Sequence, residues 1–302
     1  MEGERVRATS FLPTQNRVRW AGWAAVVAAL LTVGLMTYGG WVRASGSGLG
    51  CPDWPLCQGD VLPEFQGATA IEFGHRMFAG VTMLTVALAA LLAFRARSMA
   101  PAVYRLLVGS LALILVQAGL GGVTVLTELH GMAVVAHLIL AMITLALLTA
   151  AAIWALCPPG GVGLGIGLTS ASVVLAAVVI VLGGSLVGTG LSAACPGVPL
   201  CDERTVSWRP SLLHGAHRLA TGFLMVLLVM VAVQLRRNRG TRMLKALYHG
   251  VLLLMAAQIV VGLVSVLQIL PTGLRVLHLG LATGLWWAIT ASWTLAFIGR
   301  RT

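Results

Sequence analysis

Eight long apolar runs, each able to cross a membrane as a helix, constrain this chain more than any other feature. A helix needs about 20 predominantly apolar residues to span the hydrocarbon core. A membrane β-barrel would instead show alternating segments of about 10 residues. Only 10% of the 302 residues are charged, against about 25% in a soluble domain. We therefore expect an all-α integral membrane protein with eight transmembrane helices over residues 20–42, 71–94, 105–127, 132–156, 166–188, 211–235, 246–269 and 274–298.

The first run has features of a secretory signal peptide, because basic residues precede it and the small residues Ala44-Ser45-Gly46 follow it. The apolar core of a signal peptide is about 7–15 residues long. The apolar stretch between Arg19 and Arg43 is longer than 20 residues. We therefore expect a retained first helix.

The net charge of +11 is distributed unevenly between the two sides of the predicted helices. With a cytoplasmic N-terminus, 14 of the 20 basic residues lie on the cytoplasmic side: Arg5, Arg7, Arg17, Arg19, Arg95, Arg97, Arg105, Arg236, Arg237, Arg239, Arg242, Lys245, Arg300 and Arg301. Such an excess of Lys and Arg is typical of cytoplasmic loops. It predicts a multi-pass protein of the cell membrane with both termini cytoplasmic. Because topology accounts for the basic excess, nothing indicates a nucleic-acid partner.

The sequence also contains an internal repeat. The segment Cys51-Pro-x-x-Pro-Leu-Cys57 recurs as Cys195-Pro-x-x-Pro-Leu-Cys201, an offset of 144 residues. The other recurring positions, with offsets of 141 to 144, are Gly39-Gly40 and Gly183-Gly184, His75-Arg76 and His217-Arg218, Gln117 and Gln258, and His137 and His278.

Each half contains four predicted helices, an even number, so both halves enter the membrane in the same direction. We expect an N-terminal half over residues 1–160 and a C-terminal half over residues 161–302, joined by the Pro- and Gly-rich stretch 157–165. They should form two pseudo-symmetric four-helix bundles related by an axis along the membrane normal.

The two cysteine pairs fall in predicted outer loops, in an oxidising compartment that permits disulfides. The prolines between the partners favour a turn that brings the thiols together. We expect the disulfides Cys51–Cys57 and Cys195–Cys201. A metal site is the alternative, but no His or second Cys pair lies near either loop to complete one.

Four histidines are the candidate cofactor ligands. His75 and His217 lie about one turn inside the second helix of their halves, and His137 and His278 lie at similar depth in the fourth. Ionisable groups within a membrane usually serve a function, and imidazoles on facing helices of a bundle suit axial ligation of haem iron. His130 and His249 lack this pattern and are not expected to be ligands.

Arg76 and Arg218 directly follow the candidate ligands His75 and His217. A guanidinium group can pair with a haem propionate. Alternatively, both side chains extend to the membrane interface.

The two halves differ three residues before the first candidate ligand, where Glu72 corresponds to His214. Residues at i and i+3 share a helix face, so we expect Glu72 to face the same haem as His75. A buried carboxylate there can transfer protons, and only the first half has one. The alternative is a Glu that faces lipid headgroups.

The run from Gly46 to Cys57, followed by Glu72-x-x-His75-Arg76, resembles the bacterial haem A synthase family, in the form with a cysteine pair in each half. The resemblance covers essentially the whole chain. It implies an oxidoreductase that converts the C8 methyl of haem O to a formyl group, giving haem A for terminal oxidases. It also implies haem O synthase as a partner, together with an electron acceptor or donor and membrane lipid. The second loop departs from the motif because it lacks Asp53-Trp54.

The resemblance further implies which half does what. His217 and His278 would hold a haem b cofactor, and His75 and His137 would hold the substrate haem beside the catalytic Glu72. Two other classes of function are compatible with the four histidines. One is a dihaem b-type electron-transfer protein, which gives Glu72 no clear role. The other is a haem transporter, which parallel repeats also suit.

Overall fold

The computed structural model describes residues 12–157, 166–198, 201, 206–238 and 242–298. These residues form eight α-helices, each long and apolar enough to cross a membrane, and no β-strand. The helices are α1 (Leu12–Ala44), α2 (Gly67–Phe94), α3 (Pro101–Leu126), α4 (Gly131–Leu156), α5 (Ile166–Gly188), α6 (Trp208–Arg237), α7 (Arg242–Leu267) and α8 (Thr272–Ile298). The predicted fold class is confirmed.

Most helices begin a few residues before the predicted apolar run. The run at 20–42 belongs to a helix that starts at Leu12, and the run at 211–235 to one that starts at Trp208. Hydropathy detects only the part of a helix that lies in hydrocarbon, whereas backbone hydrogen bonding continues into the polar interface. At α3 the start is Pro101, a residue that suits the first helical turn because its missing N–H would have no partner there.

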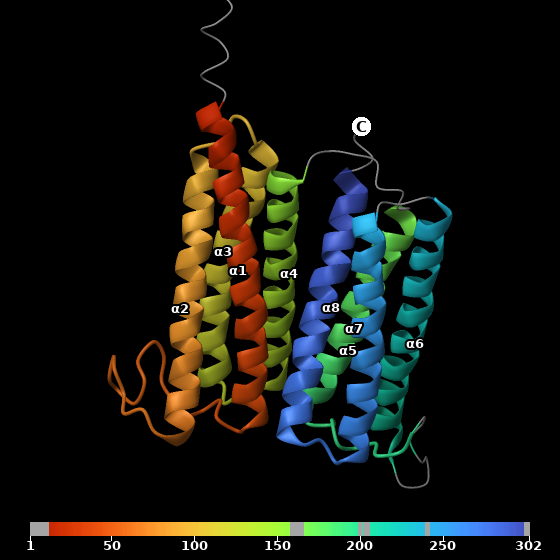
Figure 1. Cartoon of the computed structure of the whole chain (residues 1–302). Coiled ribbons are helices and arrows are strands. Elements are labelled where there is room, and N and C mark those ends of the chain that lie inside the picture. The colour runs from red at the N-terminus through yellow and green to blue at the C-terminus, as the bar shows by residue number, and fades with distance from the viewer. Residues whose placement is uncertain (1–11, 158–165, 199–200, 202–205, 239–241, 299–302) are drawn as a thin grey trace, which may run out of the picture.

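The helices form two bundles with the same internal arrangement (Figure 1). In the first, α1 and α3 each contact both α2 and α4. In the second, α5 and α7 each contact both α6 and α8. Between the bundles, α1 contacts α8, α4 contacts α5, and α4 contacts α8. Exchanging the bundles maps this set of contacts onto itself, so the predicted pseudo-symmetry is confirmed.

Small residues let the two bundles approach closely. A Cβ atom at Gly40 of α1 would lie 2.5 Å from Leu279 of α8, and one at Gly184 of α5 would lie 3.1 Å from Leu138 of α4. These two contacts are equivalent under the repeat. At the centre of the interface, the buried Trp286 indole donates a hydrogen bond of 2.9 Å to the Met142 carbonyl. Close backbone approach at small residues is a usual way to pair helices in lipid.

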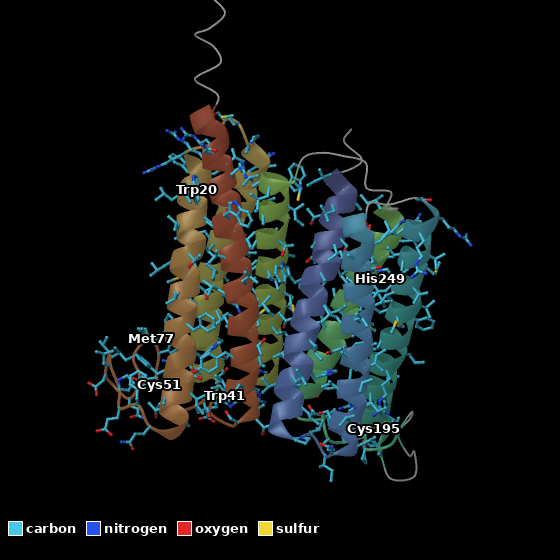
Figure 2. The ribbon with its side chains drawn as sticks, viewed as in Figure 1. Trp20, Trp41, Cys51, Met77, Cys195 and His249 are labelled. Carbon is cyan, nitrogen blue, oxygen red and sulfur yellow. A yellow bond between two sulfur atoms is a disulfide. The ribbon has the colours of Figure 1, made fainter. Side chains whose placement is uncertain are left out.

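Both cysteine-containing loops lie at the same end of the molecule, as the positions of Cys51 and Cys195 in Figure 2 show. Trp20, near the start of α1, lies toward the opposite end. An even number of helices in each half produces this arrangement. The proposed boundary at residues 160 and 161 lies outside the described residues.

Candidate functional site

Each candidate ligand histidine packs against a glycine on the preceding helix. The distances from a Cβ built on the glycine to the histidine Cε1 are 3.1 Å for Gly39–His75, 3.0 Å for Gly183–His217, 3.3 Å for Gly121–His137 and 2.9 Å for Gly262–His278. A side chain at any of these glycines would press on the edge of the imidazole. We call these four contacts the glycine seats. They fix the imidazoles in matching positions in the two halves.

Within each half, the two predicted ligands come together. His75 of α2 and His137 of α4 lie close enough to interact electrostatically, and so do His217 of α6 and His278 of α8. The fold therefore brings together the pairs that the repeat predicted. His130 and His249 lie apart from these pairs with exposed side chains, and His249 Nε2 is 3.1 Å from Arg236 Nη2.

The imidazole nitrogens of the two halves have different partners. In the second half, His217 Nδ1 lies 3.1 Å from the Val179 carbonyl, and the Gln258 amide donates to His278 Nε2 at 3.2 Å. The Nδ1 atoms of His75 and His137 in the first half, and of His278 in the second, are buried without a hydrogen-bond partner among the described residues. Such orphaned buried atoms are rare and require an explanation.

This donor set fits a haem. The hydrogen bond at His217 Nδ1 selects the tautomer whose Nε2 lone pair is available to a metal. Each half offers two imidazoles from facing helices, which is the number of axial positions on haem iron. Within the described part of the chain, no cluster of three or more His, Cys, Asp or Glu side chains could hold a bare metal ion. The porphyrin of a haem supplies the remaining ligands.

Glu72 is buried, with 6% of its surface exposed, which favours a role inside the protein over a carboxylate that faces lipid headgroups. Its Oε1 forms an ion pair of 3.2 Å with Arg76 Nε. The corresponding His214 is equally buried at 5% exposure, but its Nε2 lies 3.0 Å from the Leu191 carbonyl. The same helix position therefore carries a carboxylate paired with an arginine in one half and an imidazole that contacts a backbone carbonyl in the other.

The guanidinium of Arg76 also holds the first disulfide loop. Its Nη1 donates to the carbonyls of Asp53 at 3.0 Å and Leu56 at 2.8 Å, and its Nη2 donates to that of Cys51 at 3.0 Å. Arg76 thus joins the buried carboxylate of Glu72 to the loop through a single side chain.

Arg218 repeats the contact in the second half. Its Nη1 donates to the Gly197 carbonyl at 2.7 Å and its Nη2 to the Cys195 carbonyl at 3.2 Å. Neither propionate pairing nor extension to the interface anticipated these loop contacts. Arginine suits this role because its planar fork presents several donors in fixed directions.

The structure forms both predicted disulfides, Cys51–Cys57 and Cys195–Cys201. In the first loop, the Asp53 carboxylate accepts the backbone N–H groups of Gln58 at 2.6 Å and Gly59 at 2.8 Å. The hydrogen bond from the Gly59 N–H lowers the pKa of the Asp53 carboxyl below its usual value, and the Gln58 N–H and the charge of Arg76 lower it further.

Trp54 anchors the same loop to the membrane-spanning part of the molecule. Its indole lies over Gly122 of α3, where a Cβ would come within 2.7 Å of Trp54 Cδ2. Asp53 and Trp54 therefore fold and dock the first loop, whereas the second loop has Gly197 and Val198 at the equivalent positions.

Non-reducing peptide mapping of the purified protein should find Cys51 linked to Cys57 and Cys195 linked to Cys201. The reason is that each pair lies within one short loop whose carbonyls are held by an arginine. Reduced and alkylated protein is the control, in which both linked peptides disappear. A Cys51–Cys195 link would contradict the two separate loops.

Comparison with known proteins identifies the family. The COX15-CtaA family model, described as a cytochrome oxidase assembly protein, matches residues 21–290. The chain is similar to the haem A synthase of Symbiobacterium thermophilum, with 30% identity over 283 residues that cover 88% of this chain and 92% of the other. The haem A synthase of Bacillus pumilus is 27% identical over 274 residues, covering 84% and 88%.

A third relative has a different name. A protoheme IX farnesyltransferase of Thermus thermophilus is 29% identical over 296 residues, which cover 91% of this chain and 47% of that protein. This chain therefore spans about half the length of the Thermus protein. The match over residues 21–290 includes the four histidines, both cysteine loops and Glu72. The chain belongs to the COX15-CtaA family of cytochrome oxidase assembly proteins.

Proposed function

We propose that this protein is a haem A synthase, an oxidoreductase that converts the C8 methyl of haem O into the formyl group of haem A. The observation that carries the proposal is a duplicated pair of seated histidines with a buried carboxylate, Glu72, in only one copy. The relatives named haem A synthase, which match over most of their length, support it. A dihaem electron carrier or a transporter would leave the difference between Glu72 and His214 without a purpose.

We assign the haem b cofactor to the C-terminal half, residues 161–302, and the substrate haem to the N-terminal half, residues 1–160. His217 Nδ1 lies 3.1 Å from the Val179 carbonyl, which orients this imidazole and suits a ligand that holds one group permanently. The rings of His75 and His137 lack such partners among the described residues, which suits a site that must take up and release its ligand.

A bound haem would supply the oxidising chemistry that protein side chains lack. The glycine seats would orient the imidazoles that hold the two haems, and Glu72 would hold or move a proton at the first haem site. Arg76 keeps the Glu72 carboxylate in place through the 3.2 Å ion pair. Because the methyl group is oxidised and gains an oxygen atom, an electron acceptor or donor is a further proposed partner. Haem O synthase is the proposed source of substrate.

Co-expression with a haem O synthase, followed by chromatography and mass analysis of extracted haems, tests the proposal. We expect haem A or its hydroxymethyl precursor only when both proteins are present. Cells with the haem O synthase alone are the control and should contain haem O. Haem O without any oxidised product in the presence of this chain would contradict the proposed reaction.

We also propose that both termini are cytoplasmic. The basic residues at the end opposite the disulfide loops support this orientation. Those whose side chains are described are Arg17, Arg19, Arg95, Arg97, Arg105, Arg236, Arg237 and Lys245. Reporter fusions should show a cytoplasmic position for residue 240 and an outer position for residue 60. Outer-side reporter activity at residue 240 would reverse the orientation.

Gly183→Ala should disturb the resident haem. The new Cβ would lie 3.0 Å from His217 Cε1, so the ring must move. Overpacking of this kind costs about 1–3 kcal/mol, and we expect a shifted absorbance spectrum with reduced haem content. Gly222→Ala is the matched control, because open space surrounds Gly222 on α6 and alanine favours helices. Equal spectra for both variants would mean that the seat does not position the ligand.

A further inference from the structure

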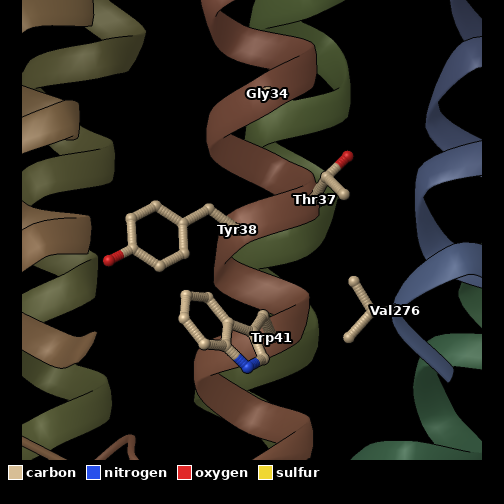
Figure 3. Close-up of a pocket in the computed structure, with 5 residues that line it drawn as sticks. All are labelled: Gly34, Thr37, Tyr38, Trp41 and Val276. Carbon is tan, nitrogen blue, oxygen red and sulfur yellow. The ribbon is translucent and has the colours of Figure 1, made fainter. Parts of the chain in front are cut away.

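Two hollows at the protein surface differ in the chemistry of their linings. The larger is a shallow groove of about 350 Å³ on α1 beside α8, and its lining residues, drawn in Figure 3, are all uncharged. The smaller, which we call the α6–α7 pocket, lies between the end of α6 and the start of α7. Its lining residues are Ala232, Leu235, Arg236, Lys245, Tyr248 and His249. Charged side chains select the charge of an occupant, so the α6–α7 pocket carries the more specific chemistry.

The polar side chains of the α6–α7 pocket are arranged before any ligand binds. Each helix contributes three residues at i, i+3 and i+4, which share one helix face. Arg236 Nη2 donates to His249 Nε2 at 3.1 Å, since a guanidinium group can only donate. Lys245 is half-buried, and Tyr248 packs in a cluster of buried apolar side chains with 3% of its surface exposed. The hydrogen bond holds the guanidinium at the mouth of the pocket, and Tyr248 closes the inner side.

The volume of the pocket limits what can enter it. At about 10 Å³, it is near the minimum that holds one water molecule. A single oxygen atom of a phosphate can therefore enter, while the rest of the group stays at the surface, where Arg236 and His249 are exposed. Guanidinium and ammonium groups form strong charge-assisted hydrogen bonds with phosphate oxygens. The lining therefore suits a phosphate at the mouth of the pocket.

The described part of the chain supplies no carboxylate to neutralise these cations. Its acidic residues belong to the end of the molecule that carries the disulfide loops; they are Asp53, Asp60, Glu64, Glu72 and Glu128. His249 lies toward the other end, away from Cys195 (Figure 2). A counter-anion for Arg236 and Lys245 must therefore come from outside the described residues.

Large apolar side chains are exposed on the membrane side of the pocket. Val229 of α6, three residues before Ala232, is 43% exposed, and Leu253 of α7, four residues after His249, is 71% exposed. Both positions continue the helix faces that line the pocket, one turn closer to the membrane centre. An occupant with a phosphate at the pocket can therefore lay hydrocarbon chains along these two side chains.

The pocket is not a general consequence of the internal repeat. At the 141-residue offset between α3 and α7, Lys245, Tyr248 and His249 correspond to Tyr104, Leu107 and Val108. The first half therefore lacks both the lysine and the histidine at this place, although it carries other basic residues at the same end, including Arg95 and Arg105. Positive charge at this end is shared by the halves, whereas the pocket is specific to the second.

We propose that the α6–α7 pocket binds the phosphate of an anionic phospholipid at the membrane surface opposite the disulfide loops. Arg236 and Lys245 donate to the phosphate oxygens, and the acyl chains lie along Val229 and Leu253. Basic pockets between transmembrane helices suit anionic headgroups in this way. The proposal does not depend on the reaction proposed above, because neither the histidine pairs nor Glu72 contribute to the pocket.

Native mass spectrometry of the purified full chain tests the site. The probes are phosphatidylglycerol, which carries a net negative charge, and phosphatidylcholine with the same acyl chains, which does not. The first phosphatidylglycerol should bind the unaltered protein more tightly than phosphatidylcholine. Replacing both Arg236→Gln and Lys245→Gln should weaken phosphatidylglycerol binding about 25-fold, or about 5-fold for each charge removed, and leave phosphatidylcholine binding unchanged.

The double variant Arg95→Gln with Arg105→Gln is the matched control, because it removes two exposed cations from the same end of the first half. It should leave the affinity for the first phosphatidylglycerol unchanged. Lys245→Arg keeps the charge and should retain binding, which separates loss of charge from misfolding. Equal affinities of the unaltered protein for the two lipids would overturn the proposal. Equal weakening by the two double variants, or loss of binding in Lys245→Arg, would overturn it as well.

Competition with glycerol phosphate distinguishes a lipid from a soluble phosphate compound. Glycerol phosphate carries the same charged group without acyl chains, so it should not displace phosphatidylglycerol from the unaltered protein. Displacement by glycerol phosphate would mean that the pocket binds a free phosphate group, and the assignment to a lipid would be wrong.

Discussion

Replacing Glu72 by glutamine should lower haem A production by about 10²–10⁴-fold, the usual contribution of a general acid–base group. Glutamine keeps the size of the side chain and an oxygen that can accept the Arg76 hydrogen bond now formed at 3.2 Å. It cannot ionise, so the substitution isolates the proton and the charge. Membrane insertion and the resident-haem spectrum should persist. Extracted haems, separated by chromatography, give the measurement, with haem O or a partly oxidised intermediate accumulating.

His214→Ala is the control at the equivalent position of the other half. It removes a buried imidazole whose partner is the Leu191 carbonyl, and its effect on haem A should be much smaller. Near-normal haem A from Glu72→Gln would show that Glu72 serves only as the ion-pair partner of Arg76. No residue would then remain that assigns catalysis to the first half.

Replacing His217 or His278 by alanine should abolish the tightly bound b-type haem spectrum, whereas His75→Ala should largely preserve it. Each alanine removes one proposed axial ligand of the resident haem, and His217 is the imidazole that the Val179 carbonyl orients at 3.1 Å. Haem content of the purified variants, measured as the pyridine complex, provides the test. His249→Ala is the control, because His249 is exposed and pairs with Arg236. Loss of the resident haem from His75→Ala alone would mean that the roles of the halves are reversed.

The fold was largely predictable because a membrane leaves few choices. Each spanning segment must satisfy its own backbone hydrogen bonds, so long apolar runs become helices. The run at 166–188 has the same bounds as α5, and the repeat predicted the two matching bundles. Pairing between bundles depends on close approach at Gly40 and Gly184, which hydropathy cannot detect.

The candidate site was predictable in its residue types and less so in its contacts. The histidine pairs followed from the repeat, but the seats at Gly121 and Gly262 were missed. Gly121 and Gly262 are 141 residues apart, the same offset as that between the histidines that they contact. This shared offset in the sequence could have identified both glycines. The contacts of Arg76 with loop carbonyls could not be predicted from the sequence, because they depend on how the chain between Cys51 and Leu56 folds back over α2.

The contact between the bundles has the form of an isologous dimer interface enclosed within one polypeptide. The α1–α8 and α4–α5 contacts exchange under the two-fold operation, and α4–α8 contains the axis. A protein consisting of one half would present this same self-complementary surface and could cover it only by pairing with a second copy. Covalent fusion of the halves removes that requirement, and it allows the two copies to diverge. One copy can then carry Glu72 while the other carries His214, a difference that a homodimer encoded by one half-length gene could not maintain.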